Sequence, residues 1–474
     1  MTSKIFIGDT PELMEIILNN LNNEFNSLYS CALVSRHWCK MSIPILWQVP
    51  FSFPSDQRPL FISQYFSSLD ENEGPILKEY RINVKFPNTL FNYAKFLKVF
   101  NLTSLEWKVK KWFEFQLASP VPYTSSIYHI INLLFKLFIE SGASLQKLDL
   151  YFSNYQINPE IFYSLGRNEQ FFSQLQDLSL GLTPDYIIEN DTILLKILAK
   201  NATKISSMKL YEFYPDYDPH SLHALICIIK SQEQLRRFSL VGLELPTEYQ
   251  GIISALESQK NSLREVIIES CECSTEFKVL KDCKNLEILR INGCCNKEIL
   301  EASLNSLEIT GYMIDASNIV QILKKSDTLL QRLKLISTDE PTLEISLLLE
   351  TLKSYCPNIT YLNISDVEFS TQFLEIIGNL QKLQFLTLRD IFEILEDEPE
   401  ILVIRFAKIL PLTLQYLDLR YSCLSLYIDS LLNNCYAPLK HLLIDYLDDE
   451  IKAKALIEFF IRKGSLNYVG VENV

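Results

Sequence analysis

The chain of 474 residues contains little glycine, histidine or methionine, with 12 Gly, 5 His and 5 Met. Scarce glycine argues against glycine-rich phosphate-binding loops and flexible linkers, because both depend on that residue. The sequence also has no G-x-x-x-x-G-K-[ST], G-x-G-x-x-G or H-E-x-x-H motif, which are signatures of nucleotide-binding proteins and metalloproteases. We therefore expect no catalytic residue and no cofactor, and we expect that the protein is not an enzyme.

Positive charge and long apolar runs are also in short supply. The chain has 44 Lys and Arg against 58 Asp and Glu, a net charge of −14. This charge repels nucleic acids and anionic membranes, so we expect neither as a partner. The most apolar stretch, residues 127–139, is interrupted by Lys136 and is too short to cross a bilayer. The first residues do not read as a signal peptide, and we expect a cytoplasmic or nuclear protein with reduced thiols.

Cysteine gathers at two places that raise the question of metal or nucleophile chemistry. Near the N-terminus, Cys31, His37 and Cys39 match no zinc spacing, and His37 and Cys39 point to different sides of a helix. The second cluster consists of Cys271, Cys273, Cys283, Cys294 and Cys295. Thiols are good small fillers of a buried core, so we expect no metal site, and zinc at the second cluster stays open as the alternative.

A repeated L-x-x-L-x-L pattern covers most of the chain. It occurs thirteen times, from SLQKLDL (144–150) to SLNYVGV (465–471), at an average interval of about 27 residues. The pattern alternates at its end, as a strand with one buried face does. Segments with helical periodicity lie between the copies, and several begin with helix-start signals such as Asp218-Pro219 and Ser370-Thr371. LTSLEW (102–107) is a candidate for a fourteenth, irregular copy.

This array resembles the leucine-rich repeat proteins of the longer, cysteine-containing, ribonuclease-inhibitor-like type. Cys271 and Cys294 stand eight positions after the first leucine of their repeats, where that type has Cys or Asn. The resemblance implies an α/β solenoid with parallel strands on the concave side and helices on the convex side. A solenoid buries its core only by stacking, since no repeat can cover its apolar face alone.

The first fifty residues lack the repeat and have helical patterns. Asp9 or Thr10 caps a first helix that has Pro11 in its first turn. A second helical stretch over residues 27–43 ends at Pro44. The stretch from Cys31 to Trp47 is rich in tryptophan and cysteine, and all four tryptophans lie in the first 112 residues. This placement indicates a packed junction between the helices and the repeats.

The same N-terminal residues resemble an F-box, a motif that occupies about residues 9–48. The residues that carry the resemblance are Pro11, Glu12, Leu13, Ile16, Ile17, Leu21, Leu28, Cys31, Val34, Ser35, Arg36, Trp38, Leu46 and Trp47. Thr10 departs from the family pattern, in which leucine commonly precedes the proline. The resemblance implies docking onto the adaptor subunit of a cullin–RING ubiquitin ligase. By the same resemblance, the apolar residues that face the adaptor are Pro11, Leu13, Ile16, Ile17, Leu21 and Leu28.

A target protein would contact the strand residues two, four and six positions after each first leucine. Over thirteen copies these positions hold eight Lys or Arg and eight Asp or Glu, which disfavours a track for a phosphate backbone. Tyrosine and arginine, which are enriched at protein-binding hot spots, gather in the C-terminal half of the array. We therefore predict substrate contact at five residues there: Tyr361, Phe385, Arg389, Tyr416 and Arg420.

Together these patterns predict an F-box-like helical unit (1–48), a junction with irregular helices and degenerate repeats (49–140) and a solenoid of about thirteen repeats (141–474). The function they favour is a non-catalytic substrate receptor of a cullin–RING ubiquitin ligase, acting in ubiquitin-dependent protein degradation. Its expected partners are the adaptor, the cullin and an unidentified target protein. Two alternatives stay open: a leucine-rich repeat scaffold without a link to ubiquitination, and an enzyme whose site carries no recognisable motif.

Overall fold

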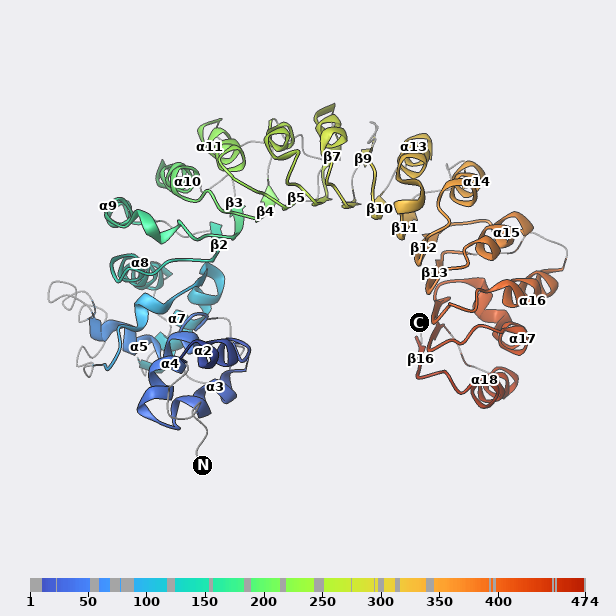
Figure 1. Cartoon of the computed structure of the whole chain (residues 1–474), viewed down its shortest axis with the longest axis horizontal. Coiled ribbons are helices and arrows are strands. Elements are labelled where there is room, and N and C mark those ends of the chain that lie inside the picture. The colour runs from blue at the N-terminus through green and yellow to red at the C-terminus, as the bar shows by residue number, and fades with distance from the viewer. Residues whose placement is uncertain are drawn as a thin grey trace. The chain divides into compact units, whose positions relative to one another are not determined.

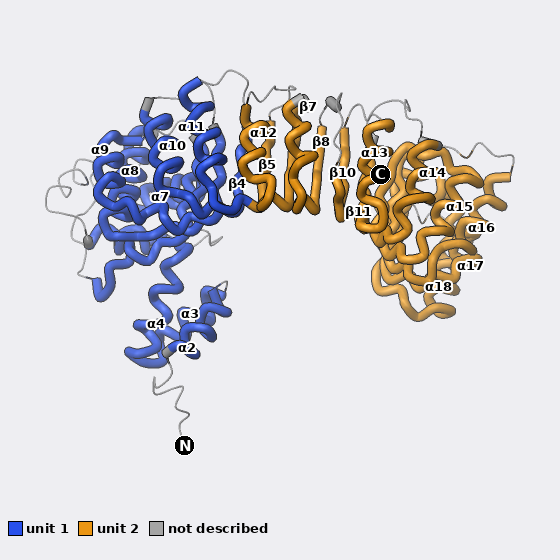
Figure 2. The backbone as a smooth tube through the Cα atoms, turned by 45° about the horizontal axis from the view of Figure 1, so that its top comes forward, with its two compact units in different colours: residues 1–235 blue, residues 236–474 orange. Residues whose placement is uncertain are grey.

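The structure of the chain is a computed structural model. The structure describes residues 11–22, 24–51, 59–68, 77, 89–116, 124–152, 157–182, 189–213, 219–242, 251–273, 275–293, 295–296, 302–311, 316–337, 345–391, 394, 398–445, 447 and 450–472. The chain divides into two compact units, Met1–Leu235 and Arg236–Val474 (Figure 2). In each unit, a layer of parallel strands packs against a layer of helices (Figure 1).

Unit 1 begins with three short helices and continues into the first strands of the array. Its helices are α2 (Pro11–Asn19), α3 (Phe25–Ala32), α4 (Arg36–Leu46), α5 (Ile62–Tyr65), α7 (Leu102–Gln116), α8 (Thr124–Glu140), α9 (Glu160–Arg167), α10 (Glu189–Asn201) and α11 (Pro219–Lys230). Its strands are β1 (Val99–Asn101), β2 (Lys147–Phe152), β3 (Asp177–Leu182) and β4 (Ser207–Phe213), which are adjacent in that order.

Unit 2 continues the alternation of strand and helix. Its main strands, in spatial order, are β5 (Arg237–Gly242), β6 (Glu265–Glu269), β8 (Ile288–Asn292), β10 (Ser306–Gly311), β11 (Arg332–Ser337), β12 (Tyr361–Ser365), β13 (Phe385–Arg389), β14 (Tyr416–Asp418), β15 (His441–Ile444) and β16 (Tyr468–Val471). Two short strands, β7 (Glu272–Cys273) and β9 (Cys295–Asn296), pair separately. The helices are α12 (Ile252–Ala255), α13 (Ala316–Ser326), α14 (Ile345–Tyr355), α15 (Thr371–Asn379), α16 (Pro399–Ile409), α17 (Ile428–Asn434) and α18 (Glu450–Lys463).

All thirteen copies of the sequence pattern form strands, and neighbouring strands within a unit pair with equivalent positions opposite one another. In unit 2, for example, Leu333 pairs with Leu362, Leu362 with Leu386 and Leu386 with Leu417. These leucines are all buried. The prediction of a parallel α/β repeat array is therefore confirmed. In unit 2 the strands line the inner side of the curve and the helices its outer side (Figure 1).

Within each unit, the carbonyl one position after a repeat's first leucine accepts two N–H groups from the next repeat. The carbonyl of Gln146 accepts from the N–H groups of Gln176 at 2.8 Å and Asp177 at 3.0 Å. In the same way, the carbonyl of Gln384 accepts from Gln415 at 2.9 Å and Tyr416 at 3.0 Å. The arrangement fixes the register at the point where each strand begins, because a slipped strand would break both bonds.

The first strand of the array has phenylalanine where the other copies mostly have leucine. The strand β1 pairs with β2, with Phe100 opposite Leu148. LTSLEW, by contrast, lies in helix α7, so the expected fourteenth copy at 102–107 was placed too late in the chain. The pattern is met instead by Leu97, Phe100 and Leu102, all of them buried.

Two helical expectations near the N-terminus are also corrected. Residues 27–43 do not form one helix, because the chain turns after Ala32 and a new helix begins at Arg36. The side chain of Ser35 caps α4 by accepting the N–H of Trp38 at 3.2 Å. Pro44 does not end α4, which continues to Leu46 and closes with the N–H of Trp47 bonded to the carbonyl of Ile43.

The repeat register predicts how two neighbouring residues of β13 respond to truncation. Leu386 is fully buried, and Leu386→Ala is expected to destabilise the folded chain by about 2–5 kcal/mol. Phe385 points to the other face and keeps 38% of its surface exposed, so Phe385→Ala is expected to cost less than about half of that. Urea unfolding followed by circular dichroism measures both variants. Equal losses, or the larger loss at Phe385, would contradict the register.

Candidate functional site

The three N-terminal helices enclose a small core of their own. Met14 and Leu18 of α2 pack with Leu28 and Ala32 of α3 and with the end of α4 at Ile45 and Leu46. All six side chains are buried, although the unit contains fewer than forty described residues. This core sets the orientation of the outer faces of α2 and α3.

Those outer faces carry large apolar side chains that solvent reaches. In α2, Leu13, Ile16 and Ile17 are exposed, and Ile16 keeps 60% of its surface accessible. The other exposed apolar side chains of the unit are Phe25, Tyr29, Leu33 and Val34. The rings of Phe25 and Tyr29 stack with centroids 6.2 Å apart. We refer to these seven residues, three on α2 and four on α3 and in the turn after it, as the helical-unit patch. Because α2 is apolar on both its inner and its outer side, its outer side suits a partner surface.

The predicted adaptor-facing residues separate into three groups. Leu13, Ile16 and Ile17 belong to the helical-unit patch. Leu28 does not lie on the surface as expected; it is buried in the core of the unit, with 1% of its surface exposed, and Leu21 is half-buried against the same core. The side chain of Pro11 lies outside the described residues, although its backbone begins α2. Helical spacing identified the apolar positions but did not reveal which side of α2 faces the core.

The end of the helical unit contacts the start of the repeat array directly through backbone hydrogen bonds. Gln48 follows α4 directly, and its carbonyl accepts the N–H groups of Lys98 at 2.9 Å and Val99 at 3.1 Å. This is the same two-bond acceptor that joins successive repeats. Next to it, the ring of Trp47 stacks on Tyr93 at 4.0 Å and meets the edge of Tyr65 at 5.1 Å. These contacts agree with the packed junction that the placement of the tryptophans indicates.

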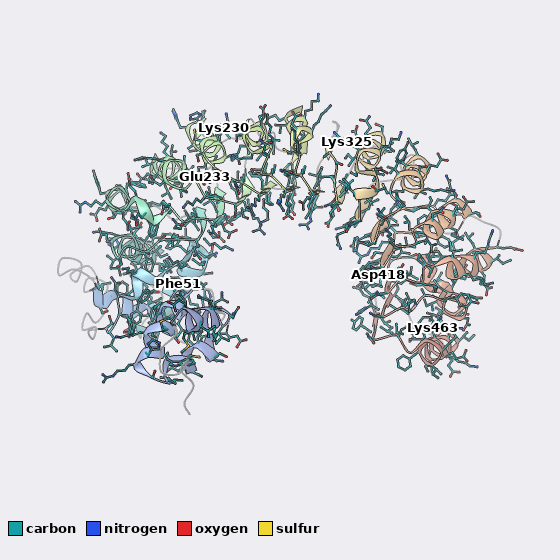
Figure 3. The ribbon with its side chains drawn as sticks, viewed as in Figure 1. Phe51, Lys230, Glu233, Lys325, Asp418 and Lys463 are labelled. Carbon is teal, nitrogen blue, oxygen red and sulfur yellow. The ribbon has the colours of Figure 1, made fainter. Side chains whose placement is uncertain are left out.

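Further aromatic residues complete this junction. Phe51, labelled in Figure 3, contacts Phe61 and Phe138 with ring centroids 5.7 and 6.1 Å apart. Trp112 is fully buried and donates from Nε1 to the Ser63 hydroxyl at 2.9 Å. The neighbouring Lys108 is buried as well. Within residues 108–112, Lys108, Val109 and Trp112 therefore belong to the interior, whereas Lys110 and Lys111 are exposed.

The second candidate surface is the strand face of unit 2. Aromatic rings occupy the second position after the first leucine in five successive repeats: Tyr361, Phe385, Tyr416, His441 and Tyr468. Their centroids follow one another at 6.3, 5.8, 6.1 and 6.2 Å, with similar tilts between neighbours. At one end, the guanidinium of Arg332 lies 4.1 Å from the centroid of the Tyr361 ring. We call these five residues the aromatic row.

The structure brings Tyr361, Phe385 and Tyr416 together in this row, as the sequence pattern implies. His441 and Tyr468 were not singled out in the sequence. Both residues could have been identified from the sequence, because they stand two positions after the first leucine of their repeats, as Tyr361, Phe385 and Tyr416 do.

Beside the row, Arg389 and Arg420 converge on Asp418, which is 1% exposed. Arg420 forms a bidentate pair with it, with Nε to Oδ1 at 3.0 Å and Nη2 to Oδ2 at 2.9 Å. Arg420 also reaches Glu472 at 2.9 Å, whereas Arg389 lies farther from Asp418, at 3.4 Å. Burial acts to raise the pKa of Asp418, but the hydrogen bonds and charge of Arg420, with the charge of Arg389, outweigh burial and lower that pKa.

In these strands, the residues four positions after each first leucine, in the middle row of the strand face, are less exposed than the alternating pattern implies. Asn363, Thr387 and Asp418 point to the strand face, yet all three are buried. Adjacent parallel strands lie only about 4.8 Å apart, so large side chains on either side of the short middle residues cover them. Arg389 and Arg420 therefore pack partly over these middle residues. The aromatic row contributes more of the accessible surface of the strand face.

Two aspartates occupy the turns that follow β12 and β13. Asp366 and Asp390 have φ values of 55° and 56°, a left-handed conformation that Asp and Asn adopt more readily than most residues. Burial raises the pKa of Asp366, and the charge of Asp390 raises it further. Burial also raises the pKa of Asp390, partly offset by the charge of Arg389. The Oδ2 atom of Asp366 is buried without a hydrogen-bond partner.

The cysteine cluster gives no sign of a metal centre in the described residues. Cys271 is buried, with its sulfur 2.8 Å from the carbonyl of Glu269. Burial, with the charge of Asp282, raises the pKa of Cys283 to about 11. Cys294 and the side chains of Cys273 and Cys295 lie outside the described residues. Within the part of the chain that is described, no three His, Cys, Asp or Glu side chains are grouped as metal ligands.

Opposite pKa shifts predict opposite effects of two Asp-to-Asn substitutions. The raised pKa of Asp366 means that its ionised form costs stability above the ordinary value of 3.8, so Asp366→Asn is expected to raise the melting temperature at pH 7 by a few degrees. This gain should shrink as the pH falls towards 3.8. The lowered pKa of Asp418 means that its ionised form stabilises the fold, and this contribution is lost only as the pH falls below 3.8.

Asp418→Asn is therefore expected to destabilise the protein at pH 7 by about 3 kcal/mol, because two arginines lose their shared counter-ion. Thermal melts between pH 3 and 7 measure both variants. A loss of stability in Asp366→Asn, or an unchanged melting temperature in Asp418→Asn at pH 7, would show that the signs are wrong.

None of the helices in the described part of the chain combines the length and apolarity required to cross a membrane. No protein-family model and no curated protein matches the sequence.

Several solved structures are similar to the chain at low sequence identity. An internalin (inlF) from Listeria monocytogenes has 13% identity and a TM-score of 0.41, with 87% of this chain and 98% of that chain covered. TLR13 in a TLR13–ssRNA13 complex has 16% identity and a TM-score of 0.37, with 72% and 52% covered. The leucine-rich repeat-containing protein LegL7 from Legionella pneumophila has 12% identity and a TM-score of 0.27, with 64% and 86% covered. By its own thirteen in-register repeats, the chain is an α/β leucine-rich repeat solenoid.

Proposed function

We propose that the protein is a substrate receptor of a cullin–RING ubiquitin ligase, in which the helical-unit patch binds the adaptor and the strand face of unit 2 binds a target protein. The observation that carries the proposal is the helical-unit patch itself. Seven large apolar side chains are exposed on a unit that already has a complete core. Soluble proteins rarely leave such a surface without a partner.

The order of residues in the helical unit adds to this support. Leu13, Ile16 and Ile17 stand at the positions where the F-box resemblance places adaptor contacts, and all three are exposed. The resemblance also includes residues that hold the unit together. Trp38 packs against the unit's core, and Ser35 caps α4.

The junction supports a function that depends on proximity. A receptor accelerates modification by holding its target near a ubiquitin-loaded enzyme, which requires a fixed orientation between docking unit and repeats. The Gln48 carbonyl and the Trp47 ring cluster provide such a connection to the first repeats of unit 1. A flexible linker at this point would reduce the effective concentration of the target at the enzyme.

The second candidate is a leucine-rich repeat interaction scaffold that does not recruit a ligase. The aromatic row favours it as much as it favours a receptor, since both functions need a protein-binding strand face. The helical-unit patch distinguishes the two candidates: a scaffold without a ligase has no use for an adaptor-binding surface at α2.

Adaptor capture tests the proposal with a charge-introducing variant and a matched control. In Leu13→Glu/Ile16→Glu, two exposed apolar side chains of α2 become charged while the core residues Met14 and Leu18 are unchanged. We expect this variant to lose at least about 100-fold in affinity for the purified adaptor, because the charges would be buried at an apolar interface. Biolayer interferometry with immobilised full-length protein measures the affinity.

The control variant is Ile457→Glu/Ile461→Glu, which makes the same change on exposed residues of α18. It should bind the adaptor as the wild type does. If the wild-type protein shows no adaptor binding in an assay where an established F-box receptor binds, the ligase proposal fails and the scaffold candidate stands.

A further inference from the structure

Positive charge is concentrated on one part of the strand face. In the four repeats that contain β11 to β14, the positions two, four and six residues after the first leucine hold four of the eight Lys and Arg residues of the whole face. The same positions hold only one of its eight acidic residues, Asp418. The other nine repeats hold four basic and seven acidic residues. This local excess stands out in a chain with a net charge of −14.

The basic residues of neighbouring strands are neutralised within the fold, whereas those of β11 are not. On β8, Arg290 pairs with Glu265 at 2.9 Å and with Glu308 at 3.4 Å. Arg332 is exposed and Lys334 is half-buried, and among the described residues neither has a carboxylate within salt-bridge distance. The two positive charges of β11 are therefore available to an external anion.

Two buried polar atoms on the neighbouring strands β12 and β13 also lack partners. Asn363 lies opposite Lys334 in the sheet register and is only 8% exposed, yet its Oδ1 atom has no hydrogen-bond partner. The Nε atom of Arg389 is likewise buried without a partner. An unsatisfied buried polar group costs about 1–3 kcal/mol, so a small shift of the covering side chains that lets a ligand bond to either atom would recover part of that cost.

The spacing of the aromatic row matches an extended polypeptide. Tyr361, Phe385 and Tyr416 follow one another at 6.3 and 5.8 Å across three strands. Alternate side chains of an extended chain lie about 6.6 Å apart on one face. A segment that crosses the strands in this conformation can place every second side chain against a successive ring, where a flat side chain packs favourably.

We propose that the face formed by Arg332, Lys334, Tyr361, Asn363, Phe385 and Tyr416 binds an extended acidic segment of the target protein, with carboxylates at Arg332 and Lys334 and alternate aromatic side chains against the rings. This inference rests on the proposed function, since it names the chemistry of the target that the receptor would hold. The carboxylate of Asp418 does not oppose such a ligand, because Arg420 pairs with it bidentately. Asp366 and Asp390 lie beyond the strands, in the turns that follow β12 and β13.

A single-stranded nucleic acid is the competing anionic ligand, because bases stack on aromatic rings and phosphates bind cations. The observations favour the peptide. A phosphate track requires a continuous row of cations, but only two unpaired ones occur here, and both belong to β11. The remaining charge of the chain is strongly negative and repels a polyanion.

Fluorescence anisotropy with the full-length protein and four labelled eight-residue peptides tests the proposal. Each probe has Ser at every second position, and its other four positions hold, in order, Asp-Asp-Tyr-Tyr (the Asp–Tyr peptide), Ser-Ser-Tyr-Tyr (Ser–Tyr), Lys-Lys-Tyr-Tyr (Lys–Tyr) or Asp-Asp-Ser-Ser (Asp–Ser), so that charge and rings lie on one face. We expect the Asp–Tyr peptide to bind at least about tenfold more tightly than each of the other three, and its affinity to fall as the salt concentration rises. Equal binding of the Asp–Tyr and Lys–Tyr peptides, or tighter binding of an eight-nucleotide oligouridine, would overturn the proposal.

Charge reversal on two strands of unit 2 locates the binding site. Arg332→Glu is expected to weaken the Asp–Tyr peptide at least about tenfold, and Phe385→Ala to reduce its advantage over the Asp–Ser peptide. Arg237→Glu makes the same reversal at the equivalent position of β5 and should leave the affinity unchanged. Equal effects of Arg332→Glu and Arg237→Glu would show that the peptide does not bind at β11.

The peptide assay and the adaptor-capture assay test two separate claims, so either claim can be overturned without the other. Adaptor binding without Asp–Tyr peptide binding would overturn only the target chemistry. Peptide binding at Arg332 without adaptor binding would overturn only the ligase function and would leave the face as a binding site of a scaffold.

Discussion

One carbonyl in each repeat determines how the next repeat is placed. It accepts two N–H groups at the start of the following strand, as Gln146 does from Gln176 and Asp177. The bonds come from the backbone, so the side chain at that position is free to vary along the chain. Burial of the leucines behind the strands then supplies most of the stabilisation. Register and side-chain direction in every repeat follow from this one contact together with the leucine pattern.

The helical unit uses the same contact. Gln48 stands where a preceding repeat would present its carbonyl, and Lys98 and Val99 donate to it as the first residues of any later strand do. The helical unit therefore takes the place of a first repeat, and Trp47 adds an aromatic contact on the side of the junction helices. A docking surface on α2 and the beginning of the array thus belong to one continuous structure within unit 1.

The sequence predicted the fold more fully than it predicted the surfaces. Leucine spacing placed all thirteen strands, because a period of two with one buried face leaves little freedom of register. Leucine spacing missed β1, because Phe100 replaces the expected leucine. Helical periodicity joined α3 and α4 into one predicted helix, because the apolar spacing continues across the turn that precedes Ser35, the N-cap of α4. At the surfaces, spacing identified Ile16 and Leu28 alike as apolar positions of helices. Only packing distinguishes the exposed Ile16 from the buried Leu28, because both sides of these helices are apolar. The convergence of Arg389 and Arg420 on Asp418 was not predictable either, because it depends on side chains from neighbouring strands.

The central claim is that the helical unit is joined to the array by the same hydrogen bonds that join the repeats to one another. Hydrogen–deuterium exchange of the full-length protein tests it at the N–H groups of Lys98 and Val99, with those of Gln176 and Asp177 as the internal reference. If Gln48 accepts both bonds in solution, the peptide that contains residues 98 and 99 should exchange as slowly as the reference peptide, to within about tenfold. Exchange of Lys98 and Val99 at the rate of an unprotected chain, with Gln176 and Asp177 still protected, would contradict the claim.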